Sequence, residues 1–259
     1  VDKESKEPMG KAQEQQLEEY LKQVLPQVKG VVLSDYGSGT ITDKLLGQIF
    51  AYCQEHNIPT IVDSRYDILR FKTVDYIKQN DAELSAAIGR DLATEENLVQ
   101  GGCELLVKMS AKGALITRGE DGMSLFQIIS PQEAADYVKS QEVSGSVDAG
   151  QFREGLAVKL VVKRQTGRLS VVQELISYQD RDILVSHIPV TDKSEVYDVS
   201  GAGDTCVATV ILGLAAGLEP LLACQLSNEA SGIAVRKMGT SVVYAQELEA
   251  RFRQLGYEA

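Results

Sequence analysis

The sequence has few of the residues on which metal centres and nucleophilic triads commonly depend. Its 259 residues include two histidines, four cysteines and no tryptophan. The cysteines lie far apart with no C-x-x-C pair, so they indicate neither a zinc site nor a disulfide framework, and are typical of small buried residues in a reducing compartment. His56 and His187 alone leave little material for a histidine-based metal site or a Ser-His-Asp triad.

The sequence also has fewer basic residues than acidic ones. The chain has 26 Lys and Arg against 37 Asp and Glu, a net charge of −11, which argues against nucleic acid as a partner because phosphate contacts need a basic face. No apolar run approaches the roughly 18 residues of a membrane span, and no apolar signal segment stands at the start. We therefore expect a cytoplasmic protein with no membrane partner, long enough to bury a substantial core.

Hydrophobic periodicity predicts helices and strands in alternation. Leu17, Leu21 and Val24 recur with the spacing of one buried helix face, and residues 30–35 have the length and β-branching of a buried strand. This alternation predicts an α/β fold with a mostly parallel sheet covered on both faces. The expected helices after the first begin near Thr42, Asp81 and Glu95, and the expected later strands cover residues 60–63, 76–77 and 114–117.

Polar residues repeatedly stand where the expected strands end. They occur at residues 34–35, 63–65, 80 and 117–119. Ligands of open α/β sheets bind outside the carboxyl ends of the strands, so these positions are candidates for a site. Polar residues also end strands and begin turns without any functional role, and for each position alone this alternative stays open.

Residues 128–182 interrupt the alternation. Pro131 favours a short helix through Lys139, whereas residues 157–164 and 169–178 have mixed helix and strand character. We expect residues 1–127 to form the first part of an α/β core and residues 183–259 the last part of the same core. The segment between them is left as an unplaced insertion, with a lid or an oligomer contact as its alternatives.

The most informative segment is Asp-Val-Ser-Gly-Ala-Gly-Asp-Thr at residues 198–205, followed by an apolar helix. A turn of small residues at a helix N-terminus leaves amide groups that bind anions. Asp204 beside a bound phosphate is placed to take a proton from a hydroxyl nucleophile, and the combination indicates phosphoryl transfer. The alternative is a glycine turn that only packs the helix; the segment is not a Walker A loop, because no Gly-Lys-Ser/Thr follows.

These eight residues resemble the second signature of the ribokinase-like (PfkB) carbohydrate kinases. More narrowly, residues 33–39, 195–198 and 237–241 are similar to the kinase domain of bacterial heptose-7-phosphate kinases. The resemblance runs from about residue 30 to 127 and again from about 183 to the end. It implies a ribokinase-like three-layer sandwich. It also implies transfer of the γ-phosphoryl group of Mg-ATP to a hydroxyl group of a sugar or sugar phosphate, with heptose 7-phosphate as the best candidate.

The resemblance also implies roles for individual residues. Asp204 would be the catalytic base, the backbone of Gly201, Ala202 and Gly203 would form the anion hole, and Asp198 would support the loop. Asn80 and Glu83 would form an N-x-x-E element that supports Mg²⁺ and the nucleotide phosphates, with Glu83 acting on Mg²⁺ through water. Thr117 and Gly119 would belong to a loop that contacts the nucleotide, and Asn228 and Gly232 would line the adenine pocket. Asp63 and Arg65 would lie near the phosphates.

Several residues have structural alternatives. Asn80 is a favoured helix N-cap and Glu83 would complete a capping box; Thr117 would only end a strand, and Asn228 would only be a polar residue on a helix face. The sequence also departs from the family's pattern. It has no G-G-x-x-x-N element or preceding sugar-binding segment, and Ser38 stands where close heptose-kinase relatives tend to carry Lys.

These departures leave three hypotheses. The chain is the nucleotide-binding and catalytic part of an ATP-dependent sugar kinase, or a non-catalytic nucleotide-binding or scaffold relative, or a kinase of this fold with a different acceptor. The joint presence of Asp204, Asn80 and Glu83 favours the first. Sheet edges left open by the absent N-terminal portion favour pairing with another chain, so we expect a homo-oligomer or a complementing chain.

Overall fold

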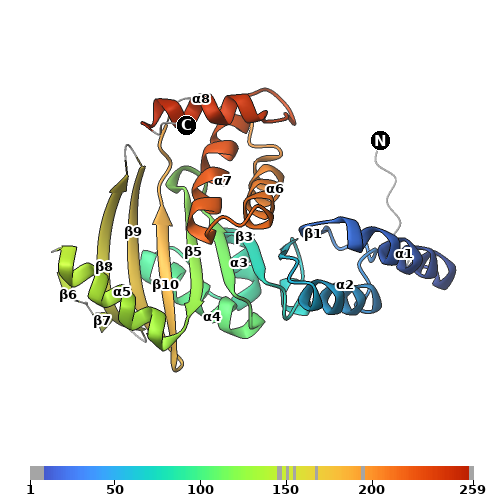
Figure 1. Cartoon of the computed structure of the whole chain (residues 1–259), viewed down its shortest axis with the longest axis horizontal. Helices are drawn as coiled ribbons and strands as arrows, with labels where there is room; N and C mark the ends of the chain where they lie inside the picture. Colours follow the sequence, from blue (N-terminus) through green and yellow to red (C-terminus); the bar gives the residue numbers. More distant parts are fainter. Residues whose placement is uncertain are drawn as a thin grey trace.

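One twisted mixed sheet forms the centre of the molecule. The computed structural model describes residues 9–144, 148–149, 152–153, 156–166, 169–193 and 196–256. In this part of the chain the strands follow the order β1-β2-β3-β4-β5-β10-β9-β8-β6, and β7 pairs with β8. Helices cover the sheet on both faces, so the predicted α/β class with its layered arrangement is observed (Figure 1).

The first four strands are parallel and bring their carboxyl ends to one edge. They are β1 (Val31–Asp35), β2 (Thr60–Ser64), β3 (Tyr76–Asn80) and β4 (Gly113–Thr117). Each lies where the apolar runs predicted a strand. The strand-ending polar residues therefore meet at one edge of the sheet, as parallel pairing requires.

Beyond β4 the sheet turns antiparallel, so the prediction of a mostly parallel sheet is right only for β1 to β4 and the whole sheet is mixed. The strands β5 (Met123–Ile129), β10 (Arg181–Ile188), β9 (Leu169–Tyr178) and β8 (Leu156–Thr166) each pair antiparallel with the preceding one. Most of the segment without a predicted placement thus extends the sheet. It also contains the helix α5 (Pro131–Ser144) and the two-residue strands β6 (Asp148–Ala149) and β7 (Phe152–Arg153).

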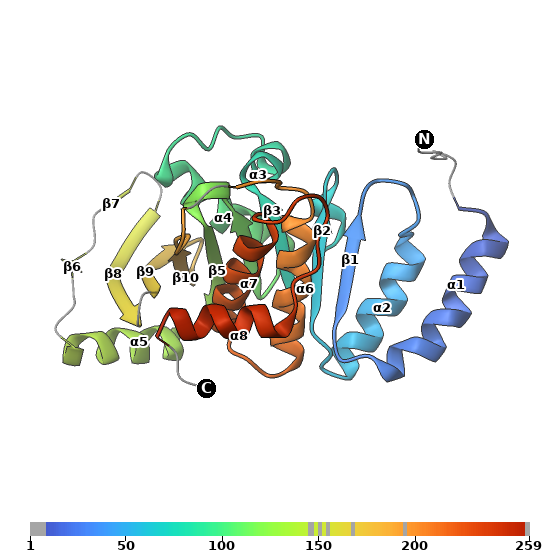
Figure 2. The ribbon, with the colours of Figure 1, turned by 90° about the horizontal axis from the view of Figure 1, so that it is seen from above.

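The helices divide between the two faces (Figures 1 and 2). One face carries α1 (Lys11–Val24), α2 (Asp43–Glu55), α3 (Asp81–Ile88) and α4 (Glu95–Met109), whose apolar residues share one core with the sheet. The other face carries α6 (Ala202–Ala215) and α7 (Pro220–Ala234), with α8 (Ala245–Gln254) packed on α7. Helix α5 packs on β8 and β9.

Alternation along β5 shows how one strand serves both cores. Phe126 is fully buried among residues of α4, whereas Leu125 and Met123 belong to the core under α6 and α7. Gly102 of α4 allows this packing, since a Cβ at this position would lie 2.3 Å from the Phe126 ring. Its neighbour Gly101 instead faces Ile88 of α3, which a Cβ would approach to 2.6 Å.

The cysteines and the helix lengths bear on two sequence-based expectations. All four cysteines are buried with free thiols, as predicted from their spacing. No helix in the described ranges has both the length and the apolar character that crossing a membrane demands.

One edge of the sheet is open in the described structure. The strand β1 pairs with β2 on one side only, because β1 stands first in the strand order. Val32 on this edge is 40% exposed and Leu212, on the adjacent helix α6, is 69% exposed. An open strand edge beside uncovered apolar side chains is a surface on which another strand can pair.

Candidate active site

Three adjacent strands align a row of polar residues beneath the N-terminus of α6. The strand register places Ser34 opposite Asp63 and Asp63 opposite Lys78. Residues opposite one another in register point to the same face, and this is the face that α6 covers. The row brings together residues that are far apart in the sequence, directly under the glycine turn.

The glycine turn itself has the backbone geometry of an anion-binding helix start. Gly201, the N-cap of α6, has φ +79°, a left-handed conformation that glycine adopts at no steric cost. The amide of Ala202 already donates to the Val199 carbonyl at 3.2 Å. The next two amides, of Gly203 and Asp204, belong to the first helical turn, which has no carbonyl of its own helix to bind. These two are the donors that the turn offers to a ligand.

Lys78 and Asp63 form a buried ion pair next to these amides. The Lys78 ammonium donates to Asp63 Oδ2 at 2.9 Å, and only 6% of the Lys78 side chain is exposed. Burial raises the pKa of Asp63, against the opposing charge of Lys78, and the negative charges of Glu83 and Asp204 raise it further. Burial lowers the pKa of Lys78, but the neighbouring Asp63 carboxylate outweighs it and the pKa is raised, so the lysine stays a cation.

Gly203 leaves room for the ammonium group of Lys78 beside the start of α6. A Cβ at this position would lie 3.0 Å from the Lys78 ammonium nitrogen. The absence of a side chain therefore lets a positive charge and the helix N-terminus reach the same point. Both favour an anion there.

Asp204 is exposed, as a base that meets a substrate must be. The Tyr36 hydroxyl donates to Asp204 Oδ1 at 3.4 Å. The turn that presents Tyr36 is fixed by the buried Asp35, which accepts from the Gly37 amide and the Ser64 hydroxyl at 3.0 Å each. The residues 34–37, singled out by their polar strand end, thus supply a partner for the predicted base.

A polar cavity of about 520 Å³ opens at this point. Five of the predicted site residues line it beside Gly203: Asp63, Arg65, Asn80, Glu83 and Asp204. The cavity carries both signs of charge, because Arg65 and Lys78 line it together with four acidic residues, Asp35, Asp63, Glu83 and Asp204. Such a cavity suits a polar ligand with hydroxyl groups and a negative charge.

Asn80 and Glu83 form a capping box at the start of α3. The Glu83 amide donates to Asn80 Oδ1 at 2.7 Å, and the Asn80 amide donates to Glu83 Oε2 at 2.8 Å. The structural role that the sequence left open is therefore observed. Since both side chains also line the polar cavity, their role toward a ligand stays a prediction.

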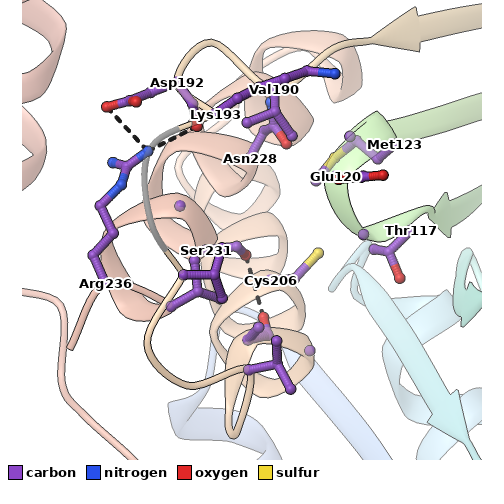
Figure 3. Close-up of a pocket in the computed structure, with 18 residues that line it drawn as sticks. Thr117, Glu120, Met123, Val190, Asp192, Lys193, Cys206, Asn228, Ser231 and Arg236 are labelled. Carbon is purple, nitrogen blue, oxygen red and sulfur yellow. Dashed lines mark hydrogen bonds and ion pairs between the residues drawn. The ribbon is translucent and has the colours of Figure 1, made fainter. Parts of the chain in front are cut away.

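A second cavity, of about 410 Å³, lies on the other side of Gly203 (Figure 3). Helix α7 forms one wall and the turn between β4 and β5 forms the other, with Met123 and Thr117 on that side and Asn228 opposite. The predicted residues Thr117, Gly119, Ala202, Gly203, Asn228 and Gly232 all line it. A Cβ on Gly232 would meet no atom within 4 Å, so this glycine faces open space.

The polar side chains of this second cavity mostly bind protein groups. The Asn228 amide donates to the Pro189 carbonyl at 2.9 Å, and the Thr117 hydroxyl donates to the Gln79 carbonyl at 3.4 Å. Both residues therefore shape the cavity wall. What remains for a ligand is a mainly apolar space that ends at the N-terminus of α6.

Two predicted site residues, Gly201 and Asp198, line neither of the two cavities. Asp198 accepts from the Ser200 amide at 2.8 Å and from the Gly239 amide at 3.1 Å. The bond from Ser200, with that from Gly239, lowers the pKa of Asp198. The contacts tie the glycine turn to residue 239, which agrees with a supporting role.

Sequence analysis missed three residues of the site: Lys78, Tyr36 and Arg236. A lysine inside the short apolar strand Tyr-Ile-Lys-Gln-Asn was a usable signal, because a buried charge requires a partner. Tyr36 stood beside a predicted strand end. Arg236, which binds Asp192 at the rim of the apolar cavity (Figure 3), gave no signal that local pattern could supply.

Comparison with known proteins identifies a family. The model of the pfkB family carbohydrate kinases matches residues 6–149 and 175–246. A curated protein of Geobacter metallireducens named bifunctional protein HldE is 30% identical over 249 residues, and its namesake in Hyphomonas neptunium is 30% identical over 257 residues. These alignments cover 96% and 99% of this chain but 40% and 42% of the relatives. The chain thus spans about two fifths of the curated relatives' length.

Solved structures show the same fold. Phosphofructokinase-2 from Escherichia coli, in complex with potassium, aligns with a TM-score of 0.60 at 17% identity over 96% of this chain and 64% of its own. Arabidopsis thaliana ribokinase, complexed with ribose and ATP, aligns with a TM-score of 0.58 at 16% identity over 91% of this chain and 58% of its own. The predicted ribokinase-like fold is confirmed.

Proposed function

Because this chain belongs to the pfkB family of carbohydrate kinases, we propose that it transfers the γ-phosphoryl group of ATP to a hydroxyl group of a sugar or sugar phosphate. The observation that carries the proposal is the meeting of two unlike cavities at Gly203. A phosphoryl transfer needs a donor and an acceptor on opposite sides of one anion site. The N-terminus of α6 lies between the two cavities, with the exposed carboxylate of Asp204 on the polar side.

The apolar cavity is suited to the nucleotide. Its walls accept a flat base between α7 and the β4–β5 turn, near Asn228 and Gly232, and its inner end reaches the amide of Gly203. A nucleotide lying in this direction would bring its terminal phosphate to the helix N-terminus, where the amides and the helix dipole favour negative charge.

The polar cavity is suited to the acceptor and to the proton transfer. Asp204 would accept the proton of the attacking hydroxyl group, and the bond from Tyr36 orients its carboxylate. The amides of Gly203 and Asp204 would hold the transferring phosphoryl group while Lys78 balances its charge. The strand register places Lys78 beside Asp63 before a ligand arrives.

Magnesium fits the site as an ion that keeps most of its water. No group of three His, Cys, Asp or Glu side chains in the described residues could hold a metal alone. The carboxylates of Asp63, Glu83 and Asp204 nevertheless line one cavity, and Glu83 uses Oε2 for the capping box. Mg²⁺ favours one or two carboxylates, waters and substrate phosphates, so Glu83 would hold it through water. The ion would neutralise phosphate charge.

Heptose 7-phosphate is the acceptor that we favour. The similarity of residues 33–39 and 237–241 to heptose kinases supports it, as do the relatives named HldE at 30% identity. Arg65 stands at the polar cavity, its guanidinium 5.7 Å from the centre of the exposed Tyr66 ring. An arginine held in this way can bind the phosphate of the acceptor through two parallel N–H···O hydrogen bonds.

A non-catalytic nucleotide-binding protein is the second candidate. The observation that favours it is the strand β1, which pairs with β2 alone among the strands that the structure describes. The open edge of β1, with Val32 exposed, offers a surface for a complementing chain or a second copy. In this alternative the apolar cavity is used and the polar cavity is incomplete.

Calorimetric titration separates the two candidates. A non-hydrolysable ATP analogue with Mg²⁺ is titrated into the protein with and without heptose 7-phosphate. The kinase hypothesis predicts nucleotide binding that tightens when the sugar phosphate is present, followed by turnover with ATP. Nucleotide binding that ignores the sugar supports the second candidate, and no nucleotide binding contradicts both.

A further inference from the structure

A cluster of ionic hydrogen bonds lies behind the apolar cavity, where α8 meets α7. Arg251 of α8 donates through Nε to Glu229 Oε2 at 2.8 Å and through Nη2 to Thr191 Oγ1 at 2.8 Å. Thr191 in turn donates to Glu229 Oε1 at 2.6 Å. The side chain of Glu229 is 3% exposed and that of Arg251 is 16% exposed, so the cluster is mostly shielded from water.

The cluster acts on a segment that forms the cavity wall. Residues 189–193 connect β10 to the glycine turn without regular secondary structure, and Val190, Asp192 and Lys193 line the apolar cavity. Thr191 points away from that row into the cluster, since its hydroxyl binds both Glu229 and Arg251. Thr191 therefore belongs to the cluster, and Asp192 belongs to both the cavity wall and the cluster, because its Oδ2 lies 3.6 Å from Arg251 Nη1.

Two further bonds hold the same segment from its ends. Asn228, the neighbour of Glu229 on α7, donates to the Pro189 carbonyl at 2.9 Å. Arg236 donates to the Asp192 carbonyl at 2.9 Å and pairs with its carboxylate at 3.1 Å (Figure 3). A segment outside any sheet needs side-chain partners for its backbone groups. Here Asn228 of α7 and Arg236 supply partners for the backbone, and Arg251 of α8 adds contacts to the side chains of Thr191 and Asp192.

The chemistry of the cluster suits it to fixing the position of the 189–193 segment more than to raising the free energy of unfolding. A buried ion pair contributes little net free energy, because the cost of removing both charges from water offsets their attraction. The guanidinium group, however, is a planar fork that fixes the direction of its partners. Its Nε and Nη2 bind two different elements, α7 and the 189–193 segment, at defined angles. The function of such an arrangement is to fix the distance between them.

We propose that Arg251 is a positioning residue for the nucleotide, holding the 189–193 wall against α7 through Glu229 and Thr191. The proposal rests on the proposed function, because it takes the apolar cavity as the nucleotide site. Arg251 itself does not line that cavity. The C-terminal helix α8 thereby takes part in nucleotide affinity without touching the nucleotide.

The test compares Arg251→Ala with Arg253→Ala, an exposed arginine two residues further along the same helix. Residues that act on a site through others commonly change its affinity by roughly 3-fold to 30-fold. We expect Arg251→Ala to raise the Kd of the ATP analogue about tenfold, which lies within this range. Arg253→Ala is expected to bind it as the unchanged protein does. Binding of the sugar phosphate alone is expected to stay the same in both variants.

Two milder variants keep the test decisive if Arg251→Ala does not fold. Thr191→Val has nearly the same shape but removes the hydroxyl group that joins Glu229 to Arg251, and Arg251→Lys keeps the charge without the fork. Each is expected to weaken nucleotide binding to an intermediate extent, about threefold on the same scale.

The outcomes separate this proposal from the proposed function. Variants that unfold at lower temperature but bind the analogue as tightly as the unchanged protein would overturn the positioning role while leaving nucleotide binding intact. An unchanged protein that binds no nucleotide would overturn both proposals. Weaker binding in Arg251→Ala and Thr191→Val, with Arg253→Ala unaffected, is the supporting result.

Discussion

The two cavities that meet at Gly203 are built from different material. The polar cavity lies over the ends of parallel strands, and its walls carry the charges of Asp63, Lys78 and Asp204. The apolar cavity lies between α7, the β4–β5 turn and residues 189–193, and most of its polar side chains bind protein groups. Charged side chains line the first cavity, whereas hydrogen bonds within the protein maintain the shape of the second.

This difference predicts that the two cavities affect different kinetic quantities in the proposed reaction. Groups that change charge or bind the transferring phosphoryl group affect the rate of the chemical step, because they act most strongly in the transition state. Groups that only shape a cavity affect ground-state affinity. Substitutions in the polar cavity should therefore lower kcat, and substitutions in the apolar cavity should change the nucleotide Kd.

The largest effect is expected from Asp204→Asn. The amide keeps the size of the side chain but cannot accept the hydroxyl proton, so we expect kcat to fall about a thousandfold, within the range typical of a lost general base. The nucleotide Kd should stay within a few-fold, because the base stands on the polar side. Steady-state kinetics and calorimetry measure the two quantities, and equal losses in both would mean that Asp204 is structural.

Lys78→Met is expected to have the next largest effect. It removes the cation beside Gly203 and leaves Asp63 buried without its partner. We expect kcat to fall about a hundredfold and the free energy of unfolding to fall by about 3 kcal/mol.

A double variant separates these two consequences. Lys78→Met combined with Asp63→Asn no longer buries an unpaired carboxylate, so stability should largely return while kcat stays low. Denaturant unfolding measures the first quantity and turnover the second. If activity returned together with stability, Lys78 would have no part in the reaction.

Gly232→Ala tests the apolar cavity. Its added methyl group meets no protein atom and points into open space at the cavity. We expect the nucleotide Kd to rise about tenfold, as for one misplaced carbon in a fitted pocket, while helix α7 gains up to about 1 kcal/mol in stability. Gly47→Ala, an exposed glycine of α2 with equal free space, is the matched control for stability alone.

The smallest effect concerns the support of the glycine turn and depends on pH. Hydrogen bonds from Ser200 and Gly239 lower the pKa of Asp198 below its ordinary value of 3.8. A lowered pKa means that the ionised form stabilises the folded state above that value, and that this stability is lost as the pH falls through the folded-state pKa.

Thermal unfolding of Asp198→Asn across the acid range measures this contribution. The unfolding temperature of the variant should lie slightly below that of the unchanged protein at neutral pH, and the two should converge in acid. Asp180→Asn, at an exposed turn between β9 and β10, should show no such convergence. A constant difference at every pH would contradict the assignment.

Local pattern identified the elements that carry the site. The strands ending at Asp35, Asn80 and Thr117 and the helix Asp81–Ile88 lie where apolar runs and capping residues predicted them. Such features depend on residues within one or two turns of each other, so they can be inferred from neighbours in the sequence.

The antiparallel half could not be placed in the same way. Residues 157–164 and 169–178 have apolar runs that fit a helix or a strand, and their own composition does not decide. They became β8 and β9 because each satisfies the backbone groups of the other and β9 pairs with β10. A partner strand elsewhere in the chain made the choice.

What the sequence determined by itself is the glycine motif and its local geometry: a glycine turn at residue 201 that begins an apolar helix, with Asp204 in its first turn. Only the tertiary structure decided what faces that turn. Tyr36 reaches Asp204 from 168 positions away, and Lys78 meets Asp63 because β2 and β3 pair in one register. A shift of one residue in that register would put the two side chains on opposite faces of the sheet, and register is a property of packed strands, which no single strand contains.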